Sequence, residues 1–189
     1  MPDPFAILGL PARPWLDAAA LQSAFHRLGA LHHPDSPGGA TAAFAAVNSA
    51  WQALRDPAQR LRHLLEIHGH TTTAGAAAIP PALADTFMGL AALRTALDRF
   101  LARHTAASGA LAQALLAGER TDLTRRLREA LAHLEASRAQ SHDTLRALDA
   151  AWDARDATTL AHLATLQQSL AFQGKWSDQL REGLFQLGA

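Results

Sequence analysis

Residues 31–39 read LHHPDSPGG, and this stretch separates two segments whose apolar residues recur at helical spacing. Proline disfavours the α region for the residue before it, so Pro34 ends the first of these helices. Asp35 and the small residues after it favour a turn. The stretch therefore predicts the tip of a helical hairpin, where His33, Pro34 and Asp35 stand on a connecting loop. Binding residues are often found on such loops.

The composition of the 189-residue chain is typical of an all-helical protein, because Ala and Leu dominate and Tyr is absent. There are 17 Lys and Arg against 17 Asp and Glu, so no excess charge points to a nucleic acid or to an anionic membrane surface. The absence of Cys excludes disulfides, thiolate metal sites and a thiol nucleophile. Neither a signal peptide nor an apolar stretch of ~20 residues is recognisable. We therefore expect a cytoplasmic protein with no nucleic-acid or membrane partner.

A change of composition divides the chain. Residues 68–82 read HGHTTTAGAAAIPPA, and this run of threonines, small residues and a double proline does not sustain a packed helix. We expect an N-terminal domain over 1–69, a linker over 70–82 and a C-terminal helical domain over 83–189.

The N-terminal domain is predicted to be a hairpin of two longer helices braced by shorter ones. Asp17 is a plausible N-cap for the helix before the loop, and Thr41 for the helix after it. Asp56-Pro57 has the pattern of an N-cap followed by proline at the first helical position, which predicts the start of another helix. The apolar face of the helix before the loop consists of Leu21, Phe25, Leu28 and His32.

Three apolar stripes at helical spacing predict an antiparallel three-helix bundle in the C-terminal domain. Breaks near 105–121 and 153–158 separate the stripes, and Gly174 is a weak point inside the last one. The stripes run over 83–104, 127–152 and 160–187.

Three segments of the N-terminal domain resemble a J-domain, the module by which J-proteins engage DnaK-type ATPase chaperones. They read DPFAILGL (3–10), LQSAFHRLGALHHPDS (21–36) and FAAVNSAWQALRDPAQRLRHLL (44–65), and they follow one another in the order of that family. His33-Pro34-Asp35 matches the family signature. The flanking matches are Phe5, Phe25, Arg27, Leu28, Phe44, Asn48, Ala50, Leu54, Asp56, Pro57 and Arg60.

The resemblance implies that His33, Pro34 and Asp35, together with Arg27, bind the nucleotide domain of the chaperone and promote its ATP hydrolysis. Each residue type has a physical reason to stand in the loop. The carboxylate of Asp35 can accept a charge-assisted hydrogen bond from an arginine of the partner. Pro34 fixes φ, so the loop loses less conformational entropy on binding. The chemistry belongs to the partner, and we expect this chain to be an activator without enzymatic activity or cofactor.

The segments LGLPAR (8–13) and NSAWQALRDPAQRLRHLLEIHG (48–69), with a second helical domain after a linker, are similar to the HscB family, the J-proteins of iron–sulfur cluster assembly. This resemblance implies a DnaK/HscA-type chaperone as one partner and an IscU-like scaffold protein as the client of the C-terminal bundle. Residues 86–98, TFMGLAALRTALD, look like the segment that supplies part of an apolar client patch. The candidate client contacts are Phe87, Met88, Ala91, Leu170 and Phe172.

The chain departs from these families in its charges. Ser36 stands where a lysine commonly follows the signature, and Arg27 is the only full cation of its helix, beside His26 and His32. We therefore expect weaker and more pH-sensitive steering toward an acidic chaperone surface. The residues that replace acidic positions near the client patch are Gly89, Ala92 and Thr95. These replacements leave the identity of the client open.

Other interpretations stay open beside this one. The client could be unrelated to iron–sulfur assembly, or the chain could be a J-like helical interaction module without chaperone coupling. Phe87 and Met88 also have the spacing of core residues with Leu83 and Leu90. The side chains of neighbouring helical residues point apart, so the adjacent His32 and His33 do not indicate a metal site. No Gly-x-Ser-x-Gly nucleophile motif occurs, and the arginines near residues 120–128 interleave with acidic residues as on a solvated helix face.

Overall fold

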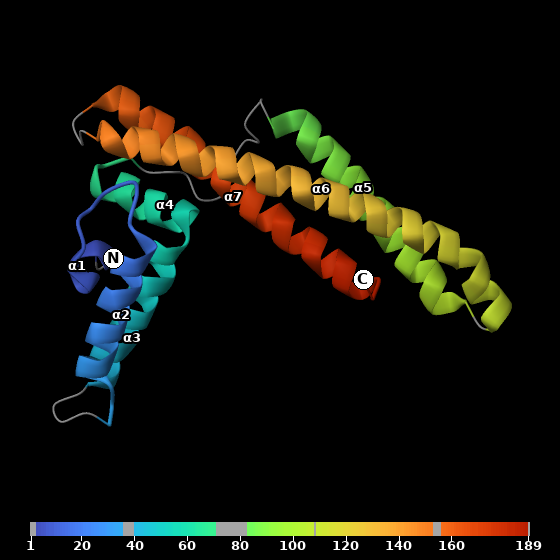
Figure 1. Cartoon of the computed structure of the whole chain (residues 1–189), viewed down its shortest axis with the longest axis horizontal. Helices are drawn as coiled ribbons and strands as arrows, with labels where there is room; N and C mark the ends of the chain where they lie inside the picture. The colour runs from blue at the N-terminus through green and yellow to red at the C-terminus, as the bar shows by residue number, and fades with distance from the viewer. Residues whose placement is uncertain (1–2, 36–39, 71–82, 108, 153–155, 189) are drawn as a thin grey trace. The chain divides into compact units, whose positions relative to one another are not determined.

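The computed structural model describes residues 3–35, 40–70, 83–107, 109–152 and 156–188 (Figure 1). Within these ranges the chain forms helices and no strand, so the protein is all-α, as its composition predicts. The helices of the described ranges are α1 (Pro4–Leu8), α2 (Ala18–His32), α3 (Thr41–Arg55), α4 (Pro57–Ile67), α5 (Ala84–Ala106), α6 (Ala110–Ala150) and α7 (Ala157–Gln186).

The helices belong to two compact units. Unit 1 comprises Met1–Ala77 together with Ser141–Ala171, and unit 2 comprises Ala78–Gln140 together with Phe172–Ala189. The long helices α6 and α7 therefore contribute residues to both units. The predicted domain boundaries are drawn by sequence composition and stay a prediction, since the linker over 70–82 lies, apart from its first residue, outside the described residues.

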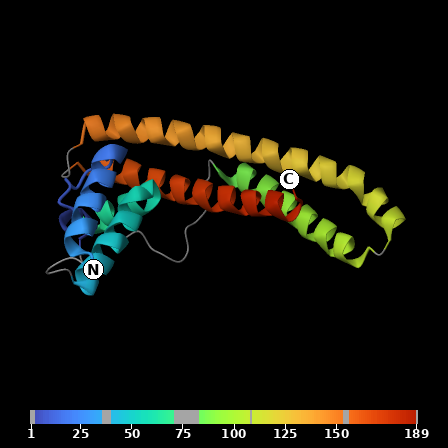
Figure 2. The same ribbon diagram turned by 60° about the horizontal axis from the view of Figure 1, so that its bottom comes forward.

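Helices α2 and α3 of unit 1 lie side by side and antiparallel, with the predicted loop at their tip (Figures 1 and 2). The start of α2 is confirmed, because the carboxylate of Asp17 accepts a hydrogen bond from the backbone N–H of Ala20 at 2.8 Å. Asp56 caps α4 in the same way, with Pro57 at the first helical position. The predicted cap of α3 is wrong by one residue. Ala40 occupies the N-cap position without a side-chain hydrogen bond, and Thr41 is already helical.

The core of unit 1 draws on all of its helices. Phe5 and Leu8 of α1 pack with Leu54 of α3, and all three are essentially buried. The end of α6 and the start of α7 close this core with apolar side chains of their own. Fully burying one such side chain contributes about 1.5–3 kcal/mol. The buried leucines of α4, α6 and α7 are Leu61, Leu64, Leu65, Leu145, Leu160, Leu163, Leu166 and Leu170.

Arg60 is a buried cation that fastens the loop between α1 and α2. Its Nε donates a hydrogen bond to the carbonyl of Pro14 at 2.9 Å, and its Nη1 donates to the carbonyl of Leu54 at 2.8 Å. Burial lowers the pKa of Arg60 to about 10, and the carboxylates of Asp56 and Asp149 partly offset this effect. Arg60 therefore remains positively charged at neutral pH, and two backbone carbonyls accept hydrogen bonds from it.

Unit 2 is built from α5, the greater part of α6 and the end of α7, in the predicted antiparallel arrangement (Figure 2). Its core is a set of leucines with one phenylalanine. Gly174 does not interrupt α7, which runs unbroken through it. The core residues are Leu90, Leu93, Leu97, Phe100, Leu123, Leu127, Leu134, Leu180 and Leu187.

The predicted break over 105–121 is too long, because α6 already begins at Ala110. The first three turns of α6 lack a buried stripe, and Leu111 and Leu115 are each 76% exposed. The segment consists nonetheless of strong helix formers, mostly Ala, Leu, Gln, Glu and Arg. The helix propensity of these residues thus explains why α6 begins before its stripe of buried apolar residues.

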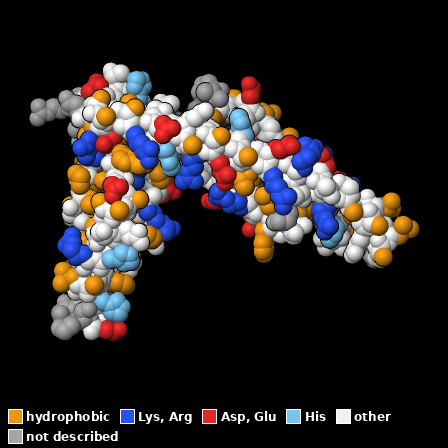
Figure 3. All heavy atoms as spheres, viewed as in Figure 1, with side chains coloured by type: hydrophobic (Ala, Val, Ile, Leu, Met, Phe, Trp, Pro, Cys, Tyr) orange, Lys and Arg blue, Asp and Glu red, His pale blue; other side chains and the backbone are white. Residues whose placement is uncertain are grey.

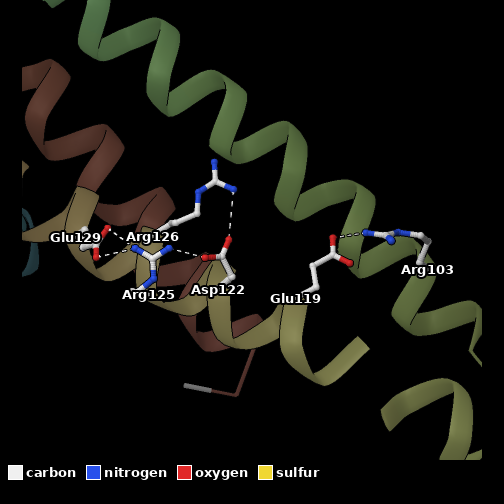
Figure 4. Close-up of polar contacts among 6 residues, drawn as sticks. All are labelled: Arg103, Glu119, Asp122, Arg125, Arg126 and Glu129. Carbon is white, nitrogen blue, oxygen red and sulfur yellow. Dashed lines mark hydrogen bonds and ion pairs between the residues drawn. The ribbon is translucent and has the colours of Figure 1, made fainter. Parts of the chain in front are cut away.

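Several arginines of this region are paired. Arg103 of α5 forms an ion pair with Glu119 of α6, and Arg125 is held between Asp122 and Glu129 on α6 itself (Figure 4). The hydrogen bonds and charges of these two carboxylates raise the pKa of Arg125. Charged side chains of both signs are also interspersed along the visible surface (Figure 3). This pairing fits the interpretation of the arginines as a solvated helix face.

Candidate functional site

The loop after α2 holds the signature residues, and His33 fixes its geometry. Helix α2 ends at His32, and His33 adopts φ −55° and ψ 135°, the extended conformation that a following proline favours. The backbone N–H of Asp35 donates a hydrogen bond to Nδ1 of His33 at 3.3 Å. The imidazole also meets the ring of Phe44 on α3 edge-on, with 5.4 Å between the ring centroids. His33 therefore connects the loop to both helices of the hairpin.

Asp35 offers its carboxylate to solvent, since 90% of its side chain is exposed. Among the described residues its side chain lies close to the imidazole of His33, whose Nδ1 is 3.6 Å from Oδ2. The residues that follow, among them Ser36, lie outside the described residues. The negative charge is thus free to meet a cation of another protein, and Pro34 beside it is exposed as well.

Arg27 lies on the exposed surface of α2, roughly two helical turns before the loop. No ion pair involves Arg27 within the described part of the chain, which leaves its charge available to an acidic partner. His26 beside it forms a 3.4 Å contact with the side chain of Gln22. The structure thus brings His33 and Asp35 together in one loop and places Arg27 apart from them, on the helix that precedes the loop.

The candidate client contacts of α5 differ in exposure. Met88 is 66% exposed, whereas Phe87 is half-buried and meets Trp176 of α7 edge-on, with ring centroids 6.0 Å apart. Ala91 is also half-buried. Phe172 also lies near this indole, in a tilted arrangement with 6.2 Å between the ring centroids. Trp176 is therefore the centre of an aromatic cluster that the sequence reasoning missed, although the spacing of four residues between Phe172 and Trp176 indicates that they share a helix face.

Leu170 has a different environment from the other candidates. It is 3% exposed and packs in the core of unit 1, so its side chain is not available to a client. This core position leaves Phe172 as the candidate contact of the last helix. Three uncharged residues near the predicted client patch are all exposed: Gly89, Ala92 and Thr95. The surface of α5 around Met88 is accordingly uncharged at these positions.

The described residues contain no group of three or more His, Asp or Glu side chains that could hold a metal ion. Among the helices of the same residues, none is both long and apolar enough to cross a membrane.

Comparisons with known proteins agree with this geometry. Residues 3–63 match the family model of the DnaJ domain. The solved structure of the chaperone HscB from Vibrio cholerae resembles the whole chain with a TM-score of 0.60, covering 98% of this chain and 99% of that one. The two sequences are 22% identical, so this likeness establishes the fold.

The exposed His33-Pro34-Asp35 loop at the tip of a helical hairpin, within a segment that matches the DnaJ domain, defines a J-domain protein. Its fold, a J-domain followed by a C-terminal helical bundle, is HscB-like. The match to the DnaJ domain supports a chaperone of the Hsp70 type as a partner.

Proposed function

We propose that this chain is a co-chaperone that stimulates the ATPase of a DnaK/HscA-type chaperone and delivers an IscU-like iron–sulfur scaffold protein to it. The observation that carries the first part is the exposed carboxylate of Asp35, held at the tip of the J-domain hairpin by the His33 contact with Phe44. The chain itself performs no bond-making step in this proposal, and it acts in the cytoplasm.

The loop acts by presenting a preorganised anion. Asp35 accepts hydrogen bonds from an arginine of the chaperone, and such a charge-assisted bond is roughly twice as strong as a neutral one. Pro34 and the hydrogen bond from the Asp35 N–H to His33 restrict the loop before binding. Less conformational entropy is then lost on association. Arg27 adds attraction to an acidic surface beside the loop.

The delivery of a scaffold protein is supported by the exposed Met88 and the half-buried aromatic pair Phe87 and Phe172 around Trp176. Apolar side chains of this kind are typical centres of protein interfaces. Electrostatic attraction to the client is limited, because Gly89, Ala92 and Thr95 carry no charge. The contact therefore depends on the burial of apolar side chains. A client other than the iron–sulfur scaffold is the second candidate, because these same positions depart from the HscB pattern.

The test of chaperone coupling is single-turnover ATP hydrolysis by a purified DnaK-type chaperone, with and without the full chain. The expected result is faster hydrolysis with the wild-type chain and no acceleration with His33→Gln. Equal acceleration by both proteins would remove the assignment of the loop. Circular dichroism of both proteins shows whether the variant keeps its helices.

Capture of partners from a lysate of the source cells separates the three interpretations. A DnaK-type chaperone together with the iron–sulfur scaffold supports the proposed function. The chaperone with another client supports a J-protein of different specificity. Capture of a client without any chaperone supports the interaction module without chaperone coupling.

A further inference from the structure

A hollow of about 400 Å³ opens on unit 1, away from the signature loop. It lies where the start of α2, the end of α3 and the start of α4 meet one residue of α6, His142. Its floor is apolar and buried, formed by Leu16, Leu21 and Pro57. The volume is within the range of about 300–1,000 Å³ that small-molecule sites occupy. The hollow is therefore large enough for a ligand with an apolar body.

Two half-buried indoles, Trp15 and Trp51, form the walls. A guanidinium lies against each ring: Arg55 is 4.5 Å from the centroid of Trp51, and Arg146 is 4.4 Å from that of Trp15. Within the described part of the chain, neither indole N–H donates to an acceptor. Both N–H groups are thus available to an acceptor of a bound molecule.

The charge of the hollow is positive, because its lining includes Arg55 and Arg60 and contains no carboxylate. No ion pair involves Arg55 among the described residues. The nearby acidic side chains are already engaged. Asp17 caps α2, Asp56 caps α4, and Asp149 pairs with Arg13 at 3.0 Å.

Arg60 gives a reason why an anion would be favourable here. This guanidinium is only 4% exposed, and its burial is what lowers its pKa. Two of its N–H groups already donate to backbone carbonyls. A buried cation is costly unless it is paired, so a negative charge brought into the hollow would stabilise it.

We propose that this hollow binds a small organic anion with an apolar body, such as an aryl-alkyl carboxylate. The apolar part contacts Leu16, Leu21 and the two indoles, and the carboxylate accepts hydrogen bonds from Arg55 and the indole N–H groups. The site stands at the first turn of α2, whereas the signature loop follows its last turn, a distance of roughly 20 Å along the helix. Binding is therefore independent of the proposed chaperone contact.

The test is a titration of the ¹⁵N-labelled full chain with 4-phenylbutyrate, followed through the four tryptophan indole N–H signals. The expected result is a saturable shift of the Trp15 and Trp51 signals, with those of Trp152 and Trp176 unmoved. The neutral analogue 4-phenylbutanol is the control for charge. Its affinity should be lower than that of 4-phenylbutyrate by a factor of about five or more. Arg55→Gln should lower the affinity for 4-phenylbutyrate by a similar factor. Arg99→Gln, which changes an exposed arginine of unit 2, should leave this affinity unchanged.

Three results of the ligand titrations with the wild-type chain would overturn the proposal. They are the absence of a saturable shift, equal binding of the alcohol, and equal shifts of all four indoles. Equal weakening by Arg55→Gln and Arg99→Gln would also overturn it, because a general effect of net charge would then explain the binding. Both arginine variants are exposed substitutions that should keep the fold, which circular dichroism checks.

Discussion

The backbone N–H of Asp35 donates a hydrogen bond to Nδ1 of His33, two residues earlier in the chain. For Nδ1 to accept this bond, the neutral imidazole must carry its proton on Nε2. The ring is held in this orientation by its edge-on contact with Phe44. His33 thus shapes the loop from within, and Asp35 keeps its carboxylate for an external partner.

Asp35→Asn should abolish stimulation of the chaperone ATPase without changing the melting temperature. The carboxylate is 90% exposed, so its charge contributes little to folding, whereas the loss of a charge-assisted bond to a partner weakens binding by at least about tenfold. Single-turnover hydrolysis and calorimetric binding measure the effect. Asp178→Asn changes another largely exposed aspartate, on α7, and is the matched control that should behave as wild type. Undiminished stimulation by Asp35→Asn would contradict the proposed role.

Met88→Ala and Phe87→Ala should separate client binding from stability. Met88 is exposed, so its truncation should weaken scaffold binding and leave the unfolding transition unchanged. Phe87 packs against Trp176, so its truncation should lower both the affinity for the scaffold protein and the stability of the fold. Together the two changes should cost about 2 kcal/mol of binding free energy, the size of an apolar hot spot. Calorimetry with the purified scaffold protein is the measurement. Unchanged affinity of the double variant, with basal ATPase stimulation intact, would argue against an HscB-type client surface.

Asp149→Ala should destabilise unit 1. Its Oδ1 accepts a hydrogen bond from the backbone N–H of Trp15 at 3.0 Å, and its side chain is only 15% exposed. Loss of a hydrogen bond to a charged group costs about 1.5–3 kcal/mol, and the half-exposed ion pair with Arg13 adds little. Urea denaturation measures the change. Asp143→Ala on the same helix removes an exposed carboxylate 3.8 Å from Arg146 and should cost less than about 0.5 kcal/mol.

The stability of the first turn of α7 should depend on pH through Asp156. Hydrogen bonds from the hydroxyl and N–H of Thr159 and from the N–H of Thr158 lower the pKa of this carboxyl below its ordinary value of 3.8. Because the folded pKa is the lower one, the stabilisation is complete above the unfolded value and is lost as the pH falls through the folded value. The protection of the Thr158 and Thr159 amides against exchange, relative to an unstructured chain at the same pH, should therefore fall on acidification below about pH 4.

Asp156→Ser is the matched variant for this pH dependence. Serine is also a good N-cap, so the first turn should persist, but it does not titrate in this range. An equal loss of amide protection in the serine variant would show that another group causes the acid effect.

The sequence predicts those features that rest on local chemistry. The capping role of Asp17 and the start of α4 at Asp56-Pro57 follow from side-chain and backbone preferences of adjacent residues, and both are confirmed. The exposure of Asp35 follows in the same way from the turn that Pro34 forces. These predictions need no knowledge of the rest of the chain.

Features that depend on distant segments are not predictable in this way. Leu170 and Phe172 are two residues apart, yet the first lies in the core of unit 1 and the second packs against the core of unit 2. The stripe pattern alone does not distinguish them. The hydrogen bond from Arg60 to Pro14 likewise joins segments 46 residues apart, and no periodicity indicates it.

Two glycines of α7 should respond in opposite ways to the same substitution. A Cβ on Gly174 would meet no atom within 4 Å, so Gly174→Ala should stabilise the protein by about 0.5–1 kcal/mol through helix propensity. A Cβ on Gly183 would lie 2.7 Å from Cδ2 of Leu97, which is 1% exposed and has little room to move. Overpacking a core costs about 1–3 kcal/mol, more than alanine gains in a helix, so Gly183→Ala should destabilise. Urea denaturation of the two variants measures the change in unfolding free energy for each. Stabilisation by Gly183→Ala would show that α5 and α7 pack less closely at this position.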